Sequence, residues 1–301
     1  MRIIKTIVVL ELLEPTRLNT YCEKFVDFFE SRKSVKKMIS KGAVNVNNCI
    51  VPGGSWLTVG DKITILDLEN TPPKAYHLEM PIIFEDNHLA IINKPAGLIV
   101  SGNQFKTLAN TLSYNLKQST ETNRLPWPQP THRIDNQTSG LVICAKTKSA
   151  RISLGNQFEN KEIEKTYYAL CSGKLNSELK EMGYFDESIN HKSAYTKFRI
   201  ISESRSLKND WLTLIKMSPK TGRTHQLRIH LSSSKIPILG DKLYAKNTIK
   251  HKGLFLAAVG LKFYHPITNE CLEFSIPLPD KFKRRIENEN RRWLKYNSQK
   301  S

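Results

Sequence analysis

In the first fifty residues, short apolar stretches alternate with polar ones. In some segments the apolar residues recur at the spacing of a helix, and in others at the spacing of a strand. Residues 1–15 contain a brief apolar run interrupted by Glu11 and Glu14, and no small-residue cleavage site follows it. A secretory signal peptide requires a longer apolar core and such a site, so this stretch predicts a strand. Leu18, Tyr21, Cys22 and Phe25 then recur every three to four residues, which predicts a helix with one apolar face.

A second helix follows, and its two faces differ sharply in charge. Ser31 is placed to cap it, Gly42 to end it, and Val35, Met38 and Ile39 to form its inner side. Its outer side is basic and carries Arg32, Lys33, Lys36 and Lys37, with Lys41 at its end. A strand over 43–46, a turn at Asn47-Asn48 and a strand over 62–65 complete a small α/β unit.

The remaining pattern predicts a second, larger domain. We place the first domain at residues 1–70, a linker containing Pro72-Pro73 at 71–78, and the second domain at 79–301. Most of the second domain reads as strands connected by helices, the latter over 105–118, 149–160 and from Pro279 onward. Residues 118–129 are polar and rich in proline, which predicts a surface loop.

Residues 225–231 are ambiguous on pattern alone. Leu227, Ile229 and Leu231 alternate as in a strand, whereas Thr224 as a cap and the Leu227–Leu231 spacing favour a helix.

The net charge of the chain indicates the class of molecule that it binds. The chain of 301 residues carries 46 lysines and arginines against 28 acidic residues, a net charge of +18. This excess favours nucleic acid over an anionic membrane surface, for which we find no basic amphipathic anchor helix. No apolar run reaches the roughly 18 residues needed to cross a bilayer, and the five cysteines are scattered, with Cys144 and Cys171 in apolar strands. These features predict a cytoplasmic protein.

The stretch His132–Lys146, HRIDNQTSGLVICAK, is the richest in candidate chemistry. Asp135 is followed by the turn residues Thr138, Ser139 and Gly140, and then by the apolar strand 141–145. A single Asp before a turn more often accepts backbone hydrogen bonds than reacts. A carboxylate on a loop that leads into rigid sheet is nevertheless also well placed to be a reactive group.

The stretch as a whole resembles the signature of the RluA family of pseudouridine synthases, with Ile134 in place of leucine. Three other blocks resemble family motifs in the expected order: Lys94-Pro95-Ala96-Gly97-Leu98, the Lys165-Thr166-Tyr167 strand, and residues 222–244. The resemblance spans residues 80–280 and decides for a helix over 225–231. It implies an α+β fold with a mixed, largely antiparallel sheet. It assigns Lys94-Pro95-Ala96-Gly97 to the support of the active-site loop.

Residues 17–66 resemble the alpha-L RNA-binding motif shared by ribosomal protein S-four and several RNA-modifying enzymes. The matching positions include Arg17-Leu18, Lys36-Lys37, Val46-Asn47 and Gly60-Asp61. The resemblance implies that Arg32, Lys33, Lys36, Lys37 and Lys41 contact RNA phosphates. From charge alone, the same face would be read as an ordinary solvated surface.

The family resemblance implies a reaction and its residues. Asp135 would be the catalytic carboxylate, Arg228 its cationic partner, and Tyr167 the aromatic that stacks on the uracil and helps remove the proton from carbon 5. A nearby cation favours an ionised carboxylate. Arg133 would fill the space left by the flipped nucleotide, while Tyr168 would point the opposite way from Tyr167. No cofactor is implied.

Three alternatives bear on this interpretation. His132, His225 and His230 suggest a metal site, but no Asp or Cys stands near them at ligand spacing, so we expect none. A non-catalytic RNA-binding or ribosome-assembly protein would explain the charge but not the catalytic set. A glycosidase usually needs two carboxylates, and Asp241 reads as a turn residue. We therefore expect a monomeric synthase acting on structured RNA, ribosomal RNA rather than tRNA.

Overall fold

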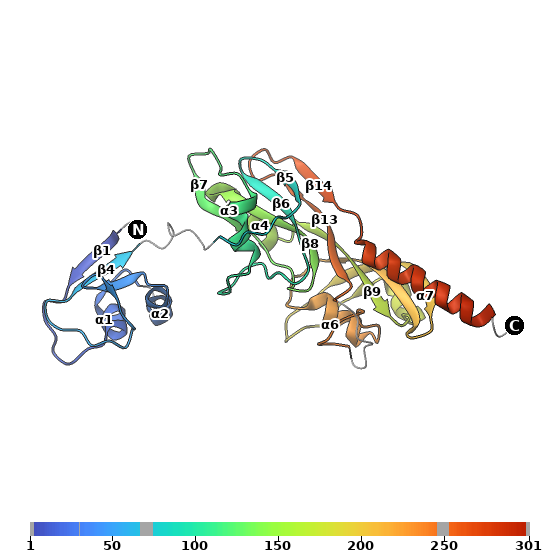
Figure 1. Ribbon diagram of the computed structural model, residues 1–301, viewed down its shortest axis with the longest axis horizontal. Coiled ribbons are helices and arrows are strands. Elements are labelled where there is room, and N and C mark those ends of the chain that lie inside the picture. Colours follow the sequence, from blue (N-terminus) through green and yellow to red (C-terminus); the bar gives the residue numbers. More distant parts are fainter. Residues whose placement is uncertain (1–2, 30, 67–74, 246–252, 299–301) are drawn as a thin grey trace. The chain divides into compact units, whose positions relative to one another are not determined.

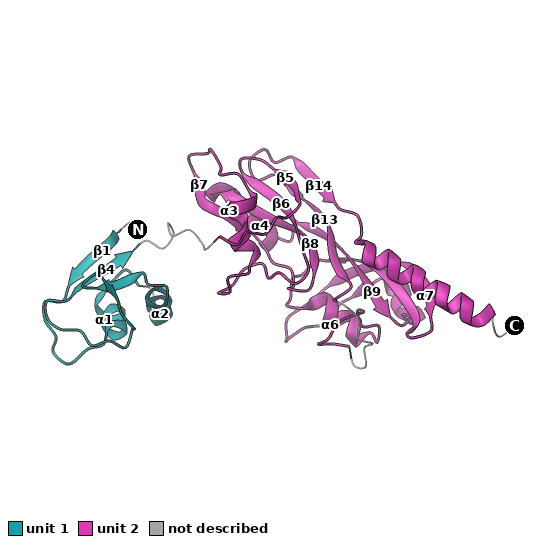
Figure 2. Ribbon diagram, in the orientation of Figure 1, with its two compact units in different colours: residues 1–73 teal, residues 74–301 magenta. Residues whose placement is uncertain are grey.

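A computed structural model describes residues 3–29, 31–66, 75–245 and 253–298. The chain divides into an N-terminal unit, residues 1–73, and a C-terminal unit, residues 74–301 (Figures 1 and 2). Residues 71–74 of the predicted linker lie outside the described residues.

The N-terminal unit is a four-stranded antiparallel sheet with two helices. The strands β1 (Ile3–Val8), β4 (Lys62–Leu66), β2 (Val44–Val46) and β3 (Cys49–Ile50) lie in that order. The helices are α1 (Leu18–Phe25) and α2 (Arg32–Ser40). Asn47 and Asn48 both have positive φ and form the β2–β3 turn, as the sequence predicts.

The two helices bury the faces that the sequence predicts, with one exception. Leu18, Tyr21 and Cys22 of α1 pack with Val35 and Ile39 of α2 in the core of the unit, whereas Phe25 is largely exposed. The Ser31 hydroxyl accepts a hydrogen bond from the Ser34 backbone N–H and caps α2 as predicted.

The C-terminal unit is built on a ten-stranded mixed sheet. Its path is β10 (Tyr184–Phe185), β11 (Thr196–Ser206), β12 (Asp210–Pro219), β9 (Glu164–Ser172), β13 (Leu256–Tyr264), β8 (Ser139–Thr147), β6 (Leu89–Lys94) and β5 (Ile82–Glu85). The strand β14 (Cys271–Ser275) pairs with β13, and β7 (Arg124–Pro130) pairs with β8. Among the described strands, only β8 and β13 pair in parallel, so the sheet is largely antiparallel as expected.

In the described part of this unit, five helices accompany the sheet. They are α3 (Leu108–Asn115), α4 (Lys148–Glu159), α5 (Ser177–Met182), α6 (Gln226–Ser233) and α7 (Asp280–Ser298). The helix predicted over 105–118 is shorter at both ends. The Thr107 side chain caps it, so it begins at Leu108, and it ends at Asn115. Residues 226–231 are helical as the family resemblance implies, but the predicted Thr224 cap is wrong. His225 occupies the cap position and makes no side-chain capping bond.

The surface loop predicted over 118–129 is wrong in its second half. Residues 124–130 form β7, which pairs with β8 through an irregular register. Because β7 pairs only with β8 in the described sheet, one of its edges is free, and prolines are tolerated where the missing N–H faces away from the partner strand. Pro126, Pro128 and Pro130 therefore make a strand sequence resemble a loop.

Gly140 is one of the two residues of β8 that pair with β13. Its φ is 127°, and a Cβ at this position would lie 2.0 Å from the carbonyl oxygen of Ala258. A side chain therefore cannot be accommodated without moving one of the two strands.

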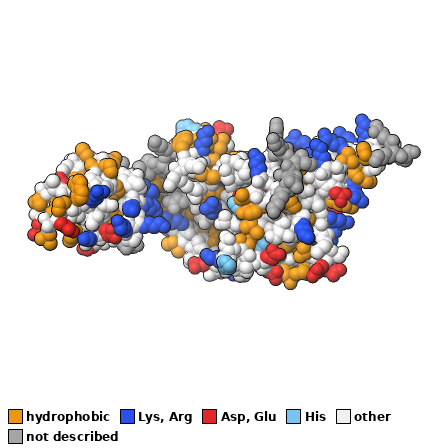
Figure 3. Space-filling model, turned by 90° about the horizontal axis from the view of Figure 1, so that it is seen from below, with side chains coloured by type: hydrophobic (Ala, Val, Ile, Leu, Met, Phe, Trp, Pro, Cys, Tyr) orange, Lys and Arg blue, Asp and Glu red, His pale blue; other side chains and the backbone are white. Residues whose placement is uncertain are grey.

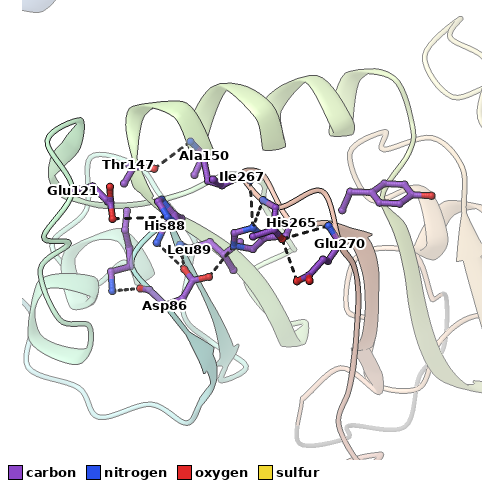
Figure 4. Close-up of polar contacts among 12 residues, drawn as sticks. Asp86, His88, Leu89, Glu121, Thr147, Ala150, His265, Ile267 and Glu270 are labelled. Carbon is purple, nitrogen blue, oxygen red and sulfur yellow. Dashed lines mark hydrogen bonds and ion pairs between the residues drawn. The ribbon is translucent and has the colours of Figure 1, made fainter.

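A polar cluster ties the β5–β6 turn to the end of β13 (Figure 4). Asp86 Oδ1 accepts hydrogen bonds from the backbone N–H groups of His88 and Leu89, and Oδ2 lies 2.8 Å from His265 Nε2. The N–H groups of Ile267 and Thr268 donate to His265 Nδ1, which places the ring proton on Nε2 facing Asp86. Burial alone would raise the pKa of Asp86, but these donors hold it below its ordinary value.

Basic side chains line much of α7, near the C-terminus (Figure 3). Phe282 and Glu289 anchor this helix, and the buried Glu289 carboxylate lies 2.5 Å from the Ser206 hydroxyl and 3.3 Å from Arg285. In the described part of the chain, no helix is both long enough and apolar enough to span a membrane.

Replacing Gly140 with alanine should destabilise the C-terminal unit by more than about 3 kcal/mol, above the usual range for a single substitution. Gly155→Ala is the matched control: nothing lies within 4 Å of a Cβ there, and the residue is within α4. It should stabilise the unit by about 0.5–1 kcal/mol. Chemical denaturation of both variants measures the difference, and equal stabilities would contradict the close approach of β8 and β13.

Candidate active site

A cavity of about 480 Å³ opens in the C-terminal unit beside the start of β8. Its lining comes from the His132–Thr138 loop, the end of α4, the start of β9 and the segment from Pro219 to Leu227. Asp135, Arg133 and Tyr167, three of the predicted site residues, are among the lining residues, whereas Arg228 is not.

Asp135 lies on the turn that leads into β8. Its backbone carbonyl accepts a hydrogen bond from the Thr138 N–H, so the turn is made by the main chain of Asp135. Its carboxylate faces one side chain of α6 and one at the cap of that helix: Oδ2 lies 3.7 Å from Arg228 Nη1, and Oδ1 lies 3.9 Å from His225 Nε2. The side chain is 24% exposed, which leaves it accessible from the cavity.

Arg228 has a closer partner than Asp135. Its Nε and Nη2 donate to the two carboxylate oxygens of Asp241 at 2.7 and 2.8 Å, a bidentate pair in which Asp241 is almost fully buried. Asp241 also accepts hydrogen bonds from the N–H groups of Leu243 and Tyr244. Burial alone would raise the pKa of Asp241, but Arg228 and these N–H groups hold it below its ordinary value.

The sequence interpretation therefore missed the main role of Asp241. The turn that we predicted for it is present, but the carboxylate also fixes the guanidinium that faces Asp135. Burial alone would lower the pKa of Arg228, and the hydrogen bonds and charges of Asp241, with the charge of Asp135, raise it. The available signal was its place in the same matched block as Arg228.

His225 begins α6 in an unusual backbone conformation. Its φ is 56°, in the left-handed region that residues other than glycine seldom adopt. The ring is held by a hydrogen bond between Nδ1 and the Tyr244 hydroxyl at 2.9 Å, which turns Nε2 toward Asp135. Strained residues of this kind concentrate at functional sites.

Tyr167 and Tyr168 lie on opposite faces of β9. Tyr167 lines the cavity, and Tyr168 does not. Burial, and secondarily the charge of Asp135, raise the pKa of Tyr167 above its ordinary value. Its phenol therefore carries its proton at neutral pH.

Lys94 connects the Lys-Pro-Ala-Gly segment to the Asp135 loop. It is fully buried, and its Nζ donates to the carbonyl oxygens of Pro95, Leu98 and Asn136 at 2.9, 2.6 and 3.2 Å. Burial lowers the pKa of Lys94 to about 8, while the charge of Asp135 acts in the opposite direction. This geometry supports the loop-supporting role that the resemblance implies.

Basic side chains surround the rest of the cavity. The lining includes five lysines or arginines against Asp135 and Glu159: Arg133, Lys161, Lys165, Lys220 and Arg223. Burial, followed by the charge of Lys220, lowers the pKa of Lys165. An anion bound between them would relieve that repulsion, so the cavity suits a phosphate-bearing ligand.

The three histidines do not converge. The Ile143 N–H donates to His132 Nε2, His230 contacts Thr196 and the Glu187 carbonyl, and His225 contacts Tyr244. Burial lowers the pKa of His132 to about 3. Within residues 3–298, omitting the undescribed gaps, no group of three or more His, Cys, Asp or Glu side chains could hold a metal ion.

The predicted RNA-binding residues of the N-terminal unit share one surface. Arg32, Lys33, Lys36, Lys37 and Lys41 are all exposed along α2 and its C-terminal end. Arg32 lies 3.4 Å from Glu23, an exposed ion pair that contributes little to stability.

Comparisons with known proteins agree with this architecture. Residues 88–233 match the model of the family described as RNA pseudouridylate synthase. An uncharacterised RNA pseudouridine synthase of Aquifex aeolicus is 33% identical over 90% of this chain and 92% of its own length. The ribosomal large subunit pseudouridine synthase D of Zymomonas mobilis is 32% identical over 83% of this chain and 86% of its own.

The fold also has a counterpart among solved structures. The human RNA pseudouridylate synthase domain containing 1 superimposes with a TM-score of 0.52 at 24% identity, covering 67% of this chain and 84% of its own. This likeness supports the fold, and the sequence relatives support the chemistry. The chain belongs to the RluA family of RNA pseudouridine synthases, and it is an isomerase that converts uridine in RNA to pseudouridine.

Proposed function

We propose that the chain isomerises specific uridines of ribosomal RNA, with Asp135 as the catalytic carboxylate. The observation that carries the proposal is the position of Asp135 between an accessible basic cavity and the guanidinium of Arg228. The relative from Zymomonas mobilis is described as a ribosomal large subunit enzyme, which favours ribosomal RNA over tRNA.

In this proposal the side chains around the Asp135 carboxylate are held in fixed positions. Asp241 holds Arg228 in a bidentate contact, and Arg228 and His225 face the two oxygens of Asp135. Such preorganised charge stabilises an ionised carboxylate without reorganisation during the reaction. Lys94 restrains the same loop from the other side through the Asn136 carbonyl.

Tyr167 has two roles in this proposal. Its ring forms part of the cavity wall and stacks on the flipped uracil. Its raised pKa keeps the hydroxyl protonated at neutral pH, and in this proposal that hydroxyl takes part in removing the proton from carbon 5. Arg133, exposed at the same cavity, is placed to occupy the gap left in the RNA.

We assign the N-terminal unit, as an alpha-L RNA-binding domain, to phosphate contacts through α2. Its support is the exposed cluster of Arg32, Lys33, Lys36 and Lys37, with no acidic residue between 31 and 60. The unit has ten lysines and arginines against eight acidic residues, so its basic character is local to this helix.

Asp135→Asn should reduce pseudouridine formation below detection while RNA binding persists, because the change removes the charge and keeps the size. Glu159→Gln is the matched control, since Glu159 lines the same cavity and has no assigned role. Release of tritium from carbon 5 of labelled uridine, in total RNA from cells lacking the gene, measures turnover. Near-normal release by the Asn variant would disprove the role of Asp135. Sequencing for pseudouridine in the same RNA identifies the class of target.

Tyr167→Phe should keep base stacking and slow product formation by about 10²–10⁴-fold, the range typical of positioned acid–base groups. Tyr168→Phe should leave the rate unchanged because that residue does not line the cavity. Single-turnover product formation, with RNA affinity measured in parallel, separates the two effects. A slow Tyr168 variant beside a normal Tyr167 variant would reverse the assignment.

Asp241→Asn should destabilise the fold by about 3–5 kcal/mol at neutral pH, because it leaves the largely buried Arg228 without its counter-charge. Asp280→Asn removes an exposed ion pair with Arg284 and should have little effect. Because the folded pKa of Asp241 is lowered, its contribution is complete above about pH 4 and is lost as the pH falls further. Denaturation between pH 2 and pH 7 should therefore show the wild type and the Asn variant converging in acid. A constant gap would mean that charge is not the cause.

A further inference from the structure

One tryptophan of the N-terminal unit lies on the surface beneath an arginine. Trp56 is 60% exposed, and the guanidinium carbon of Arg17 lies 4.7 Å from the centroid of its ring. Arg17 is exposed as well. Stacking of a guanidinium on an indole ring leaves the rest of a large aromatic surface in contact with water.

The backbone beneath this pair is fixed. The first N–H groups of α1, those of Leu18 and Asn19, donate to the carbonyl oxygens of Ser55 and Gly53. The Leu57 N–H donates to Thr16, and Arg17 and Trp56 face each other as an antiparallel bridge. Both side chains therefore project from restrained main chain, which lowers the entropy lost when a ligand binds.

The loop that carries Trp56 packs on α2. A Cβ at Gly53 would lie 3.3 Å from the Ile39 side chain on the inner face of that helix. The outer face of the same helix carries the basic cluster Arg32, Lys33, Lys36 and Lys37. One side of the unit thus offers a flat aromatic surface, and a neighbouring element offers a row of cations.

The other exposed apolar groups of this unit differ in chemistry. Phe25 is also 60% exposed, but its ring contact is with Tyr21 within α1. Phe28 is 39% exposed, and its ring contacts that of Phe29. The remaining exposed large apolar side chains in the described part of the unit, Trp56 apart, are aliphatic: Ile3, Ile4, Val8, Leu10, Leu13, Ile50 and Val59. Trp56 combines the largest planar surface with a stacked cation, the combination that receives nucleobases in single-stranded nucleic acid binding.

We propose that Arg17 and Trp56 form a stacking site for an unpaired base of the RNA substrate. The base lies against the exposed indole beside the guanidinium, and the cations of α2 contact phosphates of the same RNA. This inference rests on the proposed RNA-binding function of the N-terminal unit. It implies that the unit binds unpaired bases of RNA as well as RNA phosphates.

The test compares the full-length variants Trp56→Ala, Trp56→Phe and Phe25→Ala in binding a single-stranded oligouridylate and a fully paired RNA duplex. Trp56→Ala should weaken binding to the single strand by roughly 5- to 100-fold, since one base stack is lost. It should change duplex binding by less than about threefold. Trp56→Phe should retain most of the affinity because it keeps a ring, and Phe25→Ala should bind as the wild type.

Salt dependence distinguishes stacking from charge. Trp56→Ala should leave the slope of log affinity against log salt unchanged, because no phosphate contact is removed. Lys36→Gln combined with Lys37→Gln should flatten the slope by roughly 1 to 2. If the lysine variant flattens the slope and Trp56→Ala binds as the wild type, the stacking site is wrong while phosphate binding by the unit stands.

Three other outcomes would overturn the proposal. Equal losses for single-stranded and duplex RNA would show that Trp56 supports the fold. Equal losses for Trp56→Ala and Phe25→Ala would indicate a general apolar surface. A lowered melting temperature of Trp56→Ala with unchanged RNA affinities would mean that the ring packs on protein. Turnover by the catalytic carboxylate is measured separately, so none of these outcomes depends on it.

Discussion

The parallel contact between β8 and β13 is the constraint on which the C-terminal unit depends. It joins β5, β6 and β8 to β9, β11, β12 and β13 in one sheet, and only two residue pairs form it: Ser139 with Ala257 and Gly140 with Ala258. The Asp135 loop ends at this contact, and Tyr167 pairs with the same Ala258 from the other side. The distance between carboxylate and aromatic ring is therefore set by how closely two backbones approach.

Charged side chains also determine the structure around this contact, and the two carboxylates involved differ in how closely they are paired. Asp241 is satisfied by an arginine and two backbone donors, so its charge is stable although the residue is buried. Asp135 lies farther from Arg228, at 3.7 Å, than Asp241 does, at 2.7 Å. The buried carboxylate thus acts on structure, and the accessible one remains available for chemistry.

The sequence predicts the elements whose patterns are local, and it fails where distant residues decide. The period of two in β9 predicts that Tyr167 and Tyr168 face opposite ways, and the family resemblance indicates which of them faces the site. The neighbours of Ser31 alone predict that it caps α2. Asp241 satisfied a local turn, so its long-range pairing with Arg228 remained hidden until the fold brought α6 beside it. His225 takes a left-handed conformation, which is uncommon for any residue other than glycine, and it occupies the cap position that we predicted for Thr224.

The prolines of β7 have a consequence for the protein in a crowded solution. In the described sheet, β7 pairs only with β8, so its other edge could otherwise add a strand from a second molecule. Three of its seven residues are prolines, and each removes one of the N–H groups that such an addition requires. The prolines that make the sequence of β7 resemble a loop thus also disfavour aggregation of the sheet through this edge.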